Sequence, residues 1–209
     1  MSVLPAAVLE CARAMNACGL NRGTAGNVSA RTEGGFIVTP TGMDYTHAVP
    51  ADMVFVDMQG ESRGVRKPSS EWRFHRDIYA ARPEAGAIVH THSPFATSLA
   101  CLRMEIPAFH YMIARFGGDS VRCADYATFG TQALSDAMLK ALEGRSACLM
   151  AQHGMTVCGR DLDQALAHAV ELEALCEQYW RAWQLGPPPL LPAEEMAVVL
   201  EKFRTYGQQ

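Results

Sequence analysis

The sequence lacks the features of several large protein classes. No apolar run approaches the ~20 residues needed to span a bilayer, and no basic N-terminal segment precedes a long apolar stretch, as it would in a secretory signal. Neither charge is in excess, because 18 Lys and Arg residues face 22 Asp and Glu residues. The sequence therefore has no electrostatic signature of nucleic-acid binding. These absences predict a globular protein of one domain to one and a half, with neither a membrane nor a nucleic acid as a partner.

The cysteines do not form the pattern of a disulfide-stabilised protein. Their number is odd, at seven, and no two of them form a C-x-x-C pair. Most lie in apolar stretches, as Cys148 does within residues 147–150. This pattern favours reduced, buried side chains over disulfide bonds. We therefore expect a cytoplasmic protein.

Two common nucleotide-binding motifs are also missing. The glycine-rich segment 23–29 reads GTAGNVS, which matches neither G-x-x-x-x-G-K-[ST] nor G-x-G-x-x-G. A dinucleotide site is therefore not expected. The chain has only three lysines, and none is an obvious candidate for a desolvated Schiff-base amine.

The hydrophobic patterning alternates between helical and extended periods along the chain. Several predicted strands are joined by short turns, which is typical of antiparallel sheets rather than of βαβ units. We predict an α/β domain with a central, largely antiparallel β-sheet flanked by helices on both faces. The expected strands cover about 36–39, 54–57, 87–92, 147–152 and 155–158, and the expected helices about 4–17, 71–81, 131 or 135 to 143, 162–183 and 193–204.

Three histidines at expected strand ends indicate a metal site. His90 and His92 are two residues apart on a predicted strand, so both side chains project from the same face. Such a pair alone is more often structural than metal binding. His153 follows the apolar strand 147–152, and three imidazoles at strand ends match a catalytic zinc site with an open fourth position. The histidines at positions 47, 75, 110 and 168 have no comparable partners in the sequence, and structural or solvent roles are expected for those at 75 and 168.

Glu71 adds a carboxylate near the start of a predicted helix. It follows Ser69 and Ser70, which we expect to cap that helix. A carboxylate at this position complements the helix dipole. Alternatively, it lies near the metal and either ligates it or acts as a base.

Three short segments have the composition of anion-binding turns. They are Gly26-Asn27, Thr41-Gly42 and Ser69-Ser70. The last opens a helix, where free backbone N–H groups and the helix dipole favour phosphate. Each segment alone is weak support, because turns and caps use the same residues. Together with the histidines and Glu71, they indicate a phosphorylated substrate beside a metal.

Longer motifs run in order through nearly the whole chain. They cover residues 19–29, 39–42, 68–75, 90–92, 106–114, 126–131, 153–154 and 199–207. Because they extend through nearly the whole chain, we expect a single domain over residues 1–209. In these stretches the sequence resembles the class II aldolase/adducin-head family, and within it the L-fuculose-1-phosphate aldolases.

The resemblance implies a zinc-dependent aldolase with one zinc ion per subunit. Such an enzyme reversibly cleaves a ketose 1-phosphate, of the L-fuculose 1-phosphate type, to dihydroxyacetone phosphate and a short aldehyde of the L-lactaldehyde type. The reaction passes through an enediolate that the zinc ion stabilises. The resemblance also implies a homotetramer with active sites between subunits.

Roles for individual residues follow from the same resemblance. Glu71 is the implied acid/base and a metal ligand when no substrate is bound. Phe129, Tyr111 and Tyr206 are implied to position the aldehyde and stabilise the transition state. Tyr111 and the tail of about residues 193–209 would act in a neighbouring subunit. The implied metal ligands are Glu71, His90, His92 and His153, and the implied phosphate-binding positions are Gly26, Asn27, Thr41, Gly42, Ser69 and Ser70.

The sequence leaves the identity of the aldehyde product open. Residues Arg115 and Phe116 replace the small residues that relatives carry, on what is expected to be the aldehyde side. The same chemistry on 5-deoxyribulose 1-phosphate or 5-methylthioribulose 1-phosphate is therefore an alternative. More distant alternatives are a pentulose-phosphate 4-epimerase, a sugar-acid phosphate decarboxylase and a non-catalytic, adducin-like interaction domain. The intact histidines and Glu71 weigh against the last of these.

Overall fold

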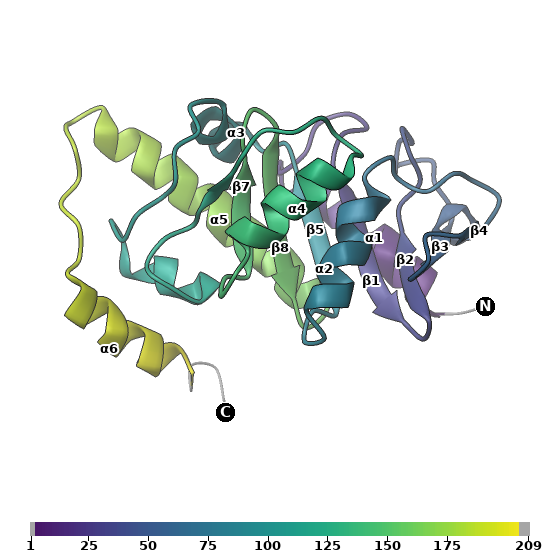
Figure 1. The fold of residues 1–209 in the computed structure, drawn as a ribbon. Helices are drawn as coiled ribbons and strands as arrows, with labels where there is room; N and C mark the ends of the chain where they lie inside the picture. The colour runs from purple at the N-terminus through teal and green to yellow at the C-terminus, as the bar shows by residue number, and fades with distance from the viewer. Residues whose placement is uncertain (1–2, 205–209) are drawn as a thin grey trace.

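An eight-stranded sheet forms the centre of the molecule. The computed structural model describes residues 3–204 (Figure 1). The strand order is β4-β3-β2-β1-β5-β8-β7-β6, and all neighbouring strands are antiparallel except β6 and β7. The predicted largely antiparallel sheet is thus confirmed. The strands are β1 (Asn27–Thr32), β2 (Gly35–Val38), β3 (Val54–Asp57), β4 (Ser62–Arg63), β5 (Ala87–Thr91), β6 (Cys123–Ala124), β7 (Ala147–Met150) and β8 (Gly154–Gly159).

Helices cover both faces of this sheet, as predicted. Helices α2 and α4 pack against each other on one face, in front of the sheet in Figure 1. Helices α1, α3 and α5 cover the other face, where α5 packs on β5 and β8. These helices are α1 (Val3–Ala17), α2 (Trp72–Ala81), α3 (Pro94–Cys101), α4 (Gln132–Ala141) and α5 (Leu162–Trp183), and short 3-10 helices cover η1 (Pro50–Asp52) and η2 (Tyr111–Phe116).

The central strand β5 is buried on both sides. Ala87 and Val89 belong to the apolar cluster under α1, α3 and α5, whereas Ile88 belongs to the cluster under α2 and α4. A strand that is buried on both faces reads as a continuous apolar run rather than an alternating one. This double burial fixes the strand that carries His90.

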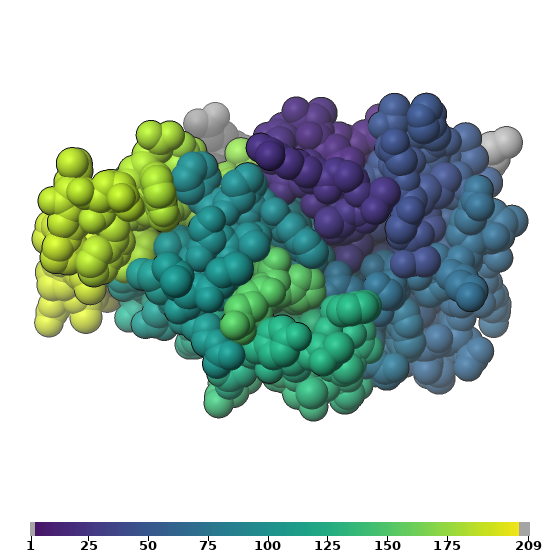
Figure 2. Space-filling model, turned by 90° about the horizontal axis from the view of Figure 1, so that it is seen from above, coloured from purple at the N-terminus to yellow at the C-terminus, as the bar shows by residue number. Residues whose placement is uncertain are grey.

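The last helix, α6 (Ala193–Phe203), lies at one end of the molecule. It packs against η2 and buries Met196 and Val199. Figure 2 shows this C-terminal part, in yellow, at the end opposite the blue segment around β3 and β4. None of the helices within residues 3–204 is both long enough and apolar enough to cross a bilayer.

Several elements agree with the sequence analysis and others differ. The predicted pairing of 147–152 with 155–158 is confirmed by the antiparallel ladder between β7 and β8. All seven cysteines are free, as expected, but only four are buried, because Cys18 and Cys101 are exposed and Cys123 is half-buried. Helix α3 is not expected from the sequence, because the segment is only eight residues long and mostly apolar. Its N-terminus depends on a distant residue, since the Glu173 carboxylate on α5 accepts hydrogen bonds from the N–H groups of Phe95 and Ala96.

Candidate active site

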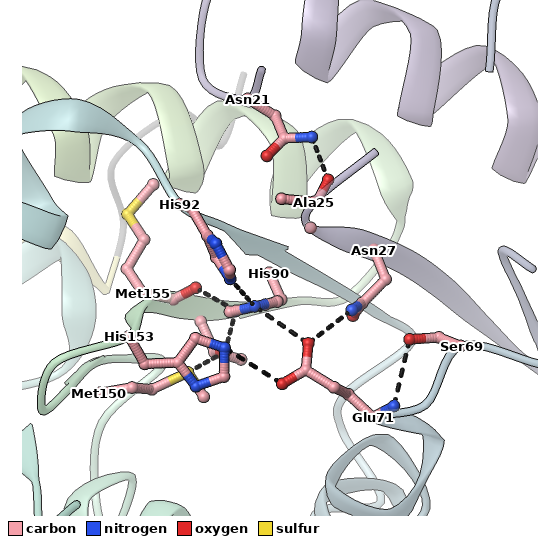
Figure 3. Close-up of polar contacts among 12 residues, drawn as sticks. Asn21, Ala25, Asn27, Ser69, Glu71, His90, His92, Met150, His153 and Met155 are labelled. Carbon is pink, nitrogen blue, oxygen red and sulfur yellow. Dashed lines mark hydrogen bonds and ion pairs between the residues drawn. The ribbon is translucent and has the colours of Figure 1, made fainter. Parts of the chain in front are cut away.

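Four side chains from separate elements converge at one edge of the sheet (Figure 3). His90 lies in β5, His92 follows that strand, His153 immediately precedes β8, and Glu71 precedes the first residue of α2. One potential ligand atom from each side chain lies within 4.8 Å of all the others. The structure therefore brings together the four residues that the sequence singled out as metal ligands.

The two oxygens of Glu71 face different imidazoles. Oε2 lies 3.2 Å from Nε2 of His90, and Oε1 lies 3.2 Å from Nε2 of His153. Nε2 of His90 is also 3.1 Å from Nε2 of His92. The three rings stand edge to face, with centroids 4.8 to 5.0 Å apart. This geometry directs several lone pairs toward one small volume.

The protonation of His90 shows that this volume suits a cation. Nδ1 of His90 lies 2.9 Å from the carbonyl oxygen of Met155, and a carbonyl can only accept, so Nδ1 donates. In the neutral ring Nε2 is then an unprotonated acceptor, although it faces a carboxylate oxygen and another imidazole. Oε1 of Glu71 is buried and has no hydrogen-bond partner. A metal ion satisfies all of these electron-pair donors, and the backbone contact at Nδ1 orients the ring as in other metal sites.

The electrostatics of the cluster agree with this interpretation. Burial by itself would raise the pKa of Glu71, but the adjacent His90 and His153 side chains outweigh burial and hold that pKa below its ordinary value. Burial, together with the neighbouring imidazoles of His90 and His153, lowers the pKa of His92 to about 4. At neutral pH the carboxylate is therefore ionised and His92 is neutral, which are the states that bind metal.

A cavity of about 330 Å³ opens beside the cluster. The segments around Thr41 and Ser69 form two of its walls. Backbone hydrogen bonds hold these segments together: the N–H of Thr41 donates to the carbonyl of Lys67, and the N–H of Ser69 donates to the carbonyl of Thr39. The third wall is set by β1, since Asn27 pairs with His90 across the β1–β5 ladder. All six phosphate-binding positions implied by the resemblance border this cavity: Gly26, Asn27, Thr41, Gly42, Ser69 and Ser70.

Gly26 lets the chain pass very close to β5. Its φ is +72°, and a Cβ atom there would lie 2.8 Å from the carbonyl oxygen of His90 and 2.9 Å from Oδ1 of Asn21. Both the left-handed conformation and the close approach exclude an ordinary side chain. A glycine is therefore required where the chain borders the cavity and passes the backbone of His90.

The start of α2 differs from the expected cap. The helix begins at Trp72, so Glu71 occupies the N-cap position, and its side chain makes no capping hydrogen bond. The Ser69 hydroxyl instead accepts from the N–H of Glu71 at 3.2 Å, one residue before the helix. The prediction that the serines cap the helix directly is therefore wrong. The Glu71 carboxylate consequently faces the imidazoles instead of the helix N–H groups.

The three aromatic residues implied to handle the aldehyde have different positions. Phe129 borders the cavity and is 63% exposed. Tyr111 lies in η2, is 51% exposed and does not border the cavity of its own chain. Tyr206 lies outside the described residues. Of the two aromatic residues that the structure describes, Phe129 borders the cavity within one chain and Tyr111 does not.

Arg115 and Phe116 do not face the candidate cavity of their own chain. Phe116 is fully buried in the core and lies edge-on to His168. Arg115 borders a separate cavity, together with Arg160 and His168. Within one chain, the expectation that these two residues lie on the aldehyde side is thus not met.

His75 is a site neighbour that the sequence analysis assigned to a structural role. Its Nε2 lies 2.5 Å from Oδ1 of Asn27, and Nδ2 of Asn27 donates to Oε2 of Glu71 at 3.0 Å. The sequence contains a signal for this proximity: residues four apart at the start of a helix lie on the same side of it, and Glu71 and His75 are four apart. No comparable pattern marks Tyr126 and Gln152, which also border the cavity.

The chain is similar to known proteins over nearly all of its length. The family model described as "Class II Aldolase and Adducin N-terminal domain" matches residues 6–180. A relative from Rhodospirillum rubrum, named 5-methylthioribulose-1-phosphate/5-deoxyribulose-1-phosphate aldolase, is 56% identical over 96% of this chain and 90% of its own. The L-fuculose phosphate aldolase of Escherichia coli K12 is 46% identical over 96% and 94%.

A solved structure gives the same result at the level of the fold. The structure of an L-fuculose 1-phosphate aldolase superposes with a TM-score of 0.94 at 38% identity, and the match covers 98% of this chain and 97% of that one. The residue cluster at the sheet edge, the adjoining cavity and the matches over nearly the whole chain all indicate the same family. The chain therefore belongs to the class II aldolase and adducin N-terminal domain family and is a lyase of the aldolase class.

Proposed function

We propose that this aldolase cleaves a ketose 1-phosphate, reversibly, into dihydroxyacetone phosphate and a short aldehyde. The observation that carries the proposal is the meeting of His90, His92, His153 and Glu71 beside a cavity walled by three segments suited to phosphate. Zinc is the proposed metal, one ion per chain, because three imidazoles with a carboxylate are a donor set typical of zinc. The cytoplasm is the proposed compartment.

The phosphate would be bound by neutral groups. Backbone N–H groups and hydroxyls at Gly26-Asn27, Thr41-Gly42 and Ser69-Ser70 line the cavity, and the start of α2 adds its dipole. This binding does not require a positively charged surface, which fits a net charge of −4. Contacts at the phosphate, remote from the reacting carbons, would hold the substrate in orientation.

Glu71 would transfer the proton at carbon. In the direction of synthesis it removes a proton from the hydroxymethyl carbon of dihydroxyacetone phosphate, and in cleavage it returns that proton. A divalent cation bound by the three histidines would supply Lewis-acid stabilisation of the negative charge that develops on the substrate oxygens. Burial of Glu71 and its position beside the cavity support this assignment.

Tyr111 and Tyr206 would complete the site from a second copy of the chain. Tyr111 is exposed and does not border the cavity of its own chain, which agrees with action in a neighbouring subunit. The proposed assembly is a homotetramer. In cleavage, one of these hydroxyls would handle the proton of the substrate hydroxyl that becomes the aldehyde oxygen.

For the aldehyde portion, we favour 5-methylthioribulose 1-phosphate and 5-deoxyribulose 1-phosphate over L-fuculose 1-phosphate. From the sequence alone, L-fuculose 1-phosphate is the first expectation. The relative named for the first two substrates is 56% identical to this chain, however, against 46% for the E. coli fuculose enzyme. The exposed rings of Phe129 and Tyr126 at the cavity also suit a methyl or methylthio end better than the additional hydroxyl of lactaldehyde.

A coupled assay for release of dihydroxyacetone phosphate tests this proposal. Fuculose, rhamnulose, 5-deoxyribulose and 5-methylthioribulose 1-phosphates are compared by kcat/KM. An apolar pocket discriminates against an added hydroxyl by roughly 10- to 100-fold, and we expect the latter two substrates to lead by that factor. Equal or higher activity on fuculose 1-phosphate would reverse the order. No release from any of the four would leave an epimerase or a decarboxylase as the better assignment.

A further inference from the structure

A line of buried polar side chains leads from the interior of the protein to Glu71. The hydroxyl oxygens of Tyr79 and Ser29 are 2.8 Å apart, and Oγ of Ser29 lies 2.7 Å from Nδ1 of His75. Nε2 of His75 lies 2.5 Å from Oδ1 of Asn27, whose Nδ2 donates to Oε2 of Glu71 at 3.0 Å. Strand β1 supplies Asn27 and Ser29, helix α2 supplies His75 and Tyr79, and Glu71 immediately precedes α2.

The direction of every hydrogen bond in this line is determined. The Glu71 carboxylate can only accept, so the NH₂ group of Asn27 faces it and the amide oxygen faces His75. An amide oxygen can only accept, so Nε2 of His75 carries the proton. In a neutral ring Nδ1 is then an acceptor and Ser29 donates to it, which leaves Tyr79 to donate to Ser29. A flipped Asn27 amide would place its oxygen against the carboxylate oxygen, which is repulsive.

The surroundings keep His75 neutral and in place. The side chain is fully buried, and its ring stacks on Phe74 at 4.5 Å and on Phe36 at 6.3 Å between centroids. Burial lowers the pKa of His75 to about 3, so the ring is uncharged at neutral pH. A neutral ring has one donor and one acceptor, and the line uses both.

We propose that His75 is a positioning residue that acts on Glu71 through the Asn27 amide. The amide occupies Oε2 of Glu71 as a hydrogen-bond donor, whereas Oε1 has no hydrogen-bond partner. The two carboxylate oxygens therefore differ in their partners: the Asn27 amide holds Oε2, whereas Oε1 faces Nε2 of His153 at 3.2 Å, so the amide sets the orientation of the whole carboxylate. Because Asn27 also borders the phosphate cavity, one amide sets the carboxylate relative to the substrate phosphate. This inference rests on the proposed acid/base role of Glu71.

The tautomer of His75 is tested first, on the wild-type protein. Two-dimensional ¹⁵N–¹H spectra of the histidine rings distinguish a proton at Nε2 from one at Nδ1. We expect His75 to be a neutral Nε2–H tautomer at pH 7, assigned by loss of its signals in a His75→Gln chain. A proton at Nδ1, or a charged ring, would overturn the inference whether or not the protein is an aldolase.

Two substitutions then separate positioning from packing. His75→Gln keeps a donor near the Nε2 position, and His75→Asn keeps only a group near Nδ1. The readout is deuterium exchange into dihydroxyacetone phosphate, which needs no knowledge of the aldehyde. We expect His75→Asn to lower kcat roughly 10- to 100-fold, because a misplaced catalytic group costs about that much. His75→Gln should stay within about threefold of wild type.

A double-mutant cycle and a buried-histidine control complete the test. In an Asn27→Ala background, His75→Asn should cause no further loss of kcat, because its effect passes through the missing amide. His168, also buried and bonded to a backbone carbonyl, provides the control. His168→Asn should lower the melting temperature without lowering kcat per folded chain.

The remaining outcomes separate positioning by His75 from simple packing and from failure of the proposed function. Equal losses in His75→Gln and His75→Asn, or additivity with Asn27→Ala, would overturn positioning and leave only packing. If His75→Asn fails to fold, the spectrum and the His75→Gln kinetics decide. Wild-type protein without exchange would count against the proposed function, whereas exchange combined with the opposite tautomer would count against this inference alone.

Discussion

Replacing Glu71 by Gln tests the central assignment, because the structure accommodates the amide. Gln has nearly the same shape as Glu, and its carbonyl oxygen can take the Oε2 position, where it still accepts from Asn27 at 3.0 Å. Its NH₂ group then takes the Oε1 position, 3.2 Å from Nε2 of His153. The contact between these two side chains is kept, because an amide N–H can donate to an unprotonated imidazole nitrogen. The variant should therefore fold normally.

The chemical loss should be large. The amide cannot take up a proton at neutral pH, and a positioned general base contributes about 10²- to 10⁴-fold to rate. We expect kcat for exchange and for cleavage to fall by at least about a hundredfold, whereas KM changes by only a few fold. Three histidines remain, so zinc should stay bound at one ion per chain.

The assay combines exchange kinetics with metal analysis. Deuterium incorporation into dihydroxyacetone phosphate is followed by NMR, and zinc content is measured by mass spectrometry after gel filtration. Glu33→Gln is the matched control, since this exposed residue follows β1 at the end opposite to Asn27. It should leave both quantities unchanged. Near wild-type exchange in Glu71→Gln would show that another group is the base, and loss of zinc would show that Glu71 acts mainly as a ligand.

Three further predictions follow from the same region. His92→Ala should lose zinc and activity together, whereas the exposed His47→Ala should lose neither; unchanged zinc content in the first variant would remove His92 from the ligand set. Gly26→Ala should be about 2 kcal/mol less stable than Gly34→Ala in urea unfolding. The two glycines have nearly equal φ values, but only Gly26 of the two has atoms close to the position of an added Cβ. Equal stabilities of the two variants would contradict the close approach at Gly26. In metal-free protein the folded state keeps His75 neutral down to a pKa of about 3, whereas the unfolded chain protonates it near pH 6.5, so stability falls as the pH drops below about 6. This residue should lower the free energy of unfolding by roughly 1 kcal/mol per pH unit. The free energy of unfolding should therefore depend less steeply on pH in His75→Gln than in the wild type. Equal slopes in the two proteins would refute the assignment of a buried, neutral His75.

The metal cluster could be predicted from the sequence because its rules are local. Strand alternation places His90 and His92 on one face, and an apolar strand followed by His153 places that ring at a strand end. Glu71 was identified by its position at a helix start. None of these inferences needs to know which strands are neighbours in the sheet.

The parts that could not be predicted depend on non-local pairing. The contact of Asn27 with His75 and Glu71 exists because β1 pairs with β5 in the register that sets Asn27 opposite His90. Nothing within either segment specifies that register. The cap of α3 likewise depends on Glu173, which belongs to a helix far along the chain. The role proposed for Tyr111 would require a second chain, so one subunit cannot display it.

The dispersed origin of the four converging side chains would link supply of the proposed metal to the survival of the protein. They come from the start of α2 and from the ends of β5 and β8, which meet only when the sheet is assembled. The unfolded chain therefore has no preformed site, and the binding energy of the proposed metal would add to the global free energy of unfolding. At a free metal concentration 1,000 times the dissociation constant, this linkage adds about 4 kcal/mol. Zinc starvation would then lower the amount of enzyme, through proteolysis of opened chains, as well as its turnover.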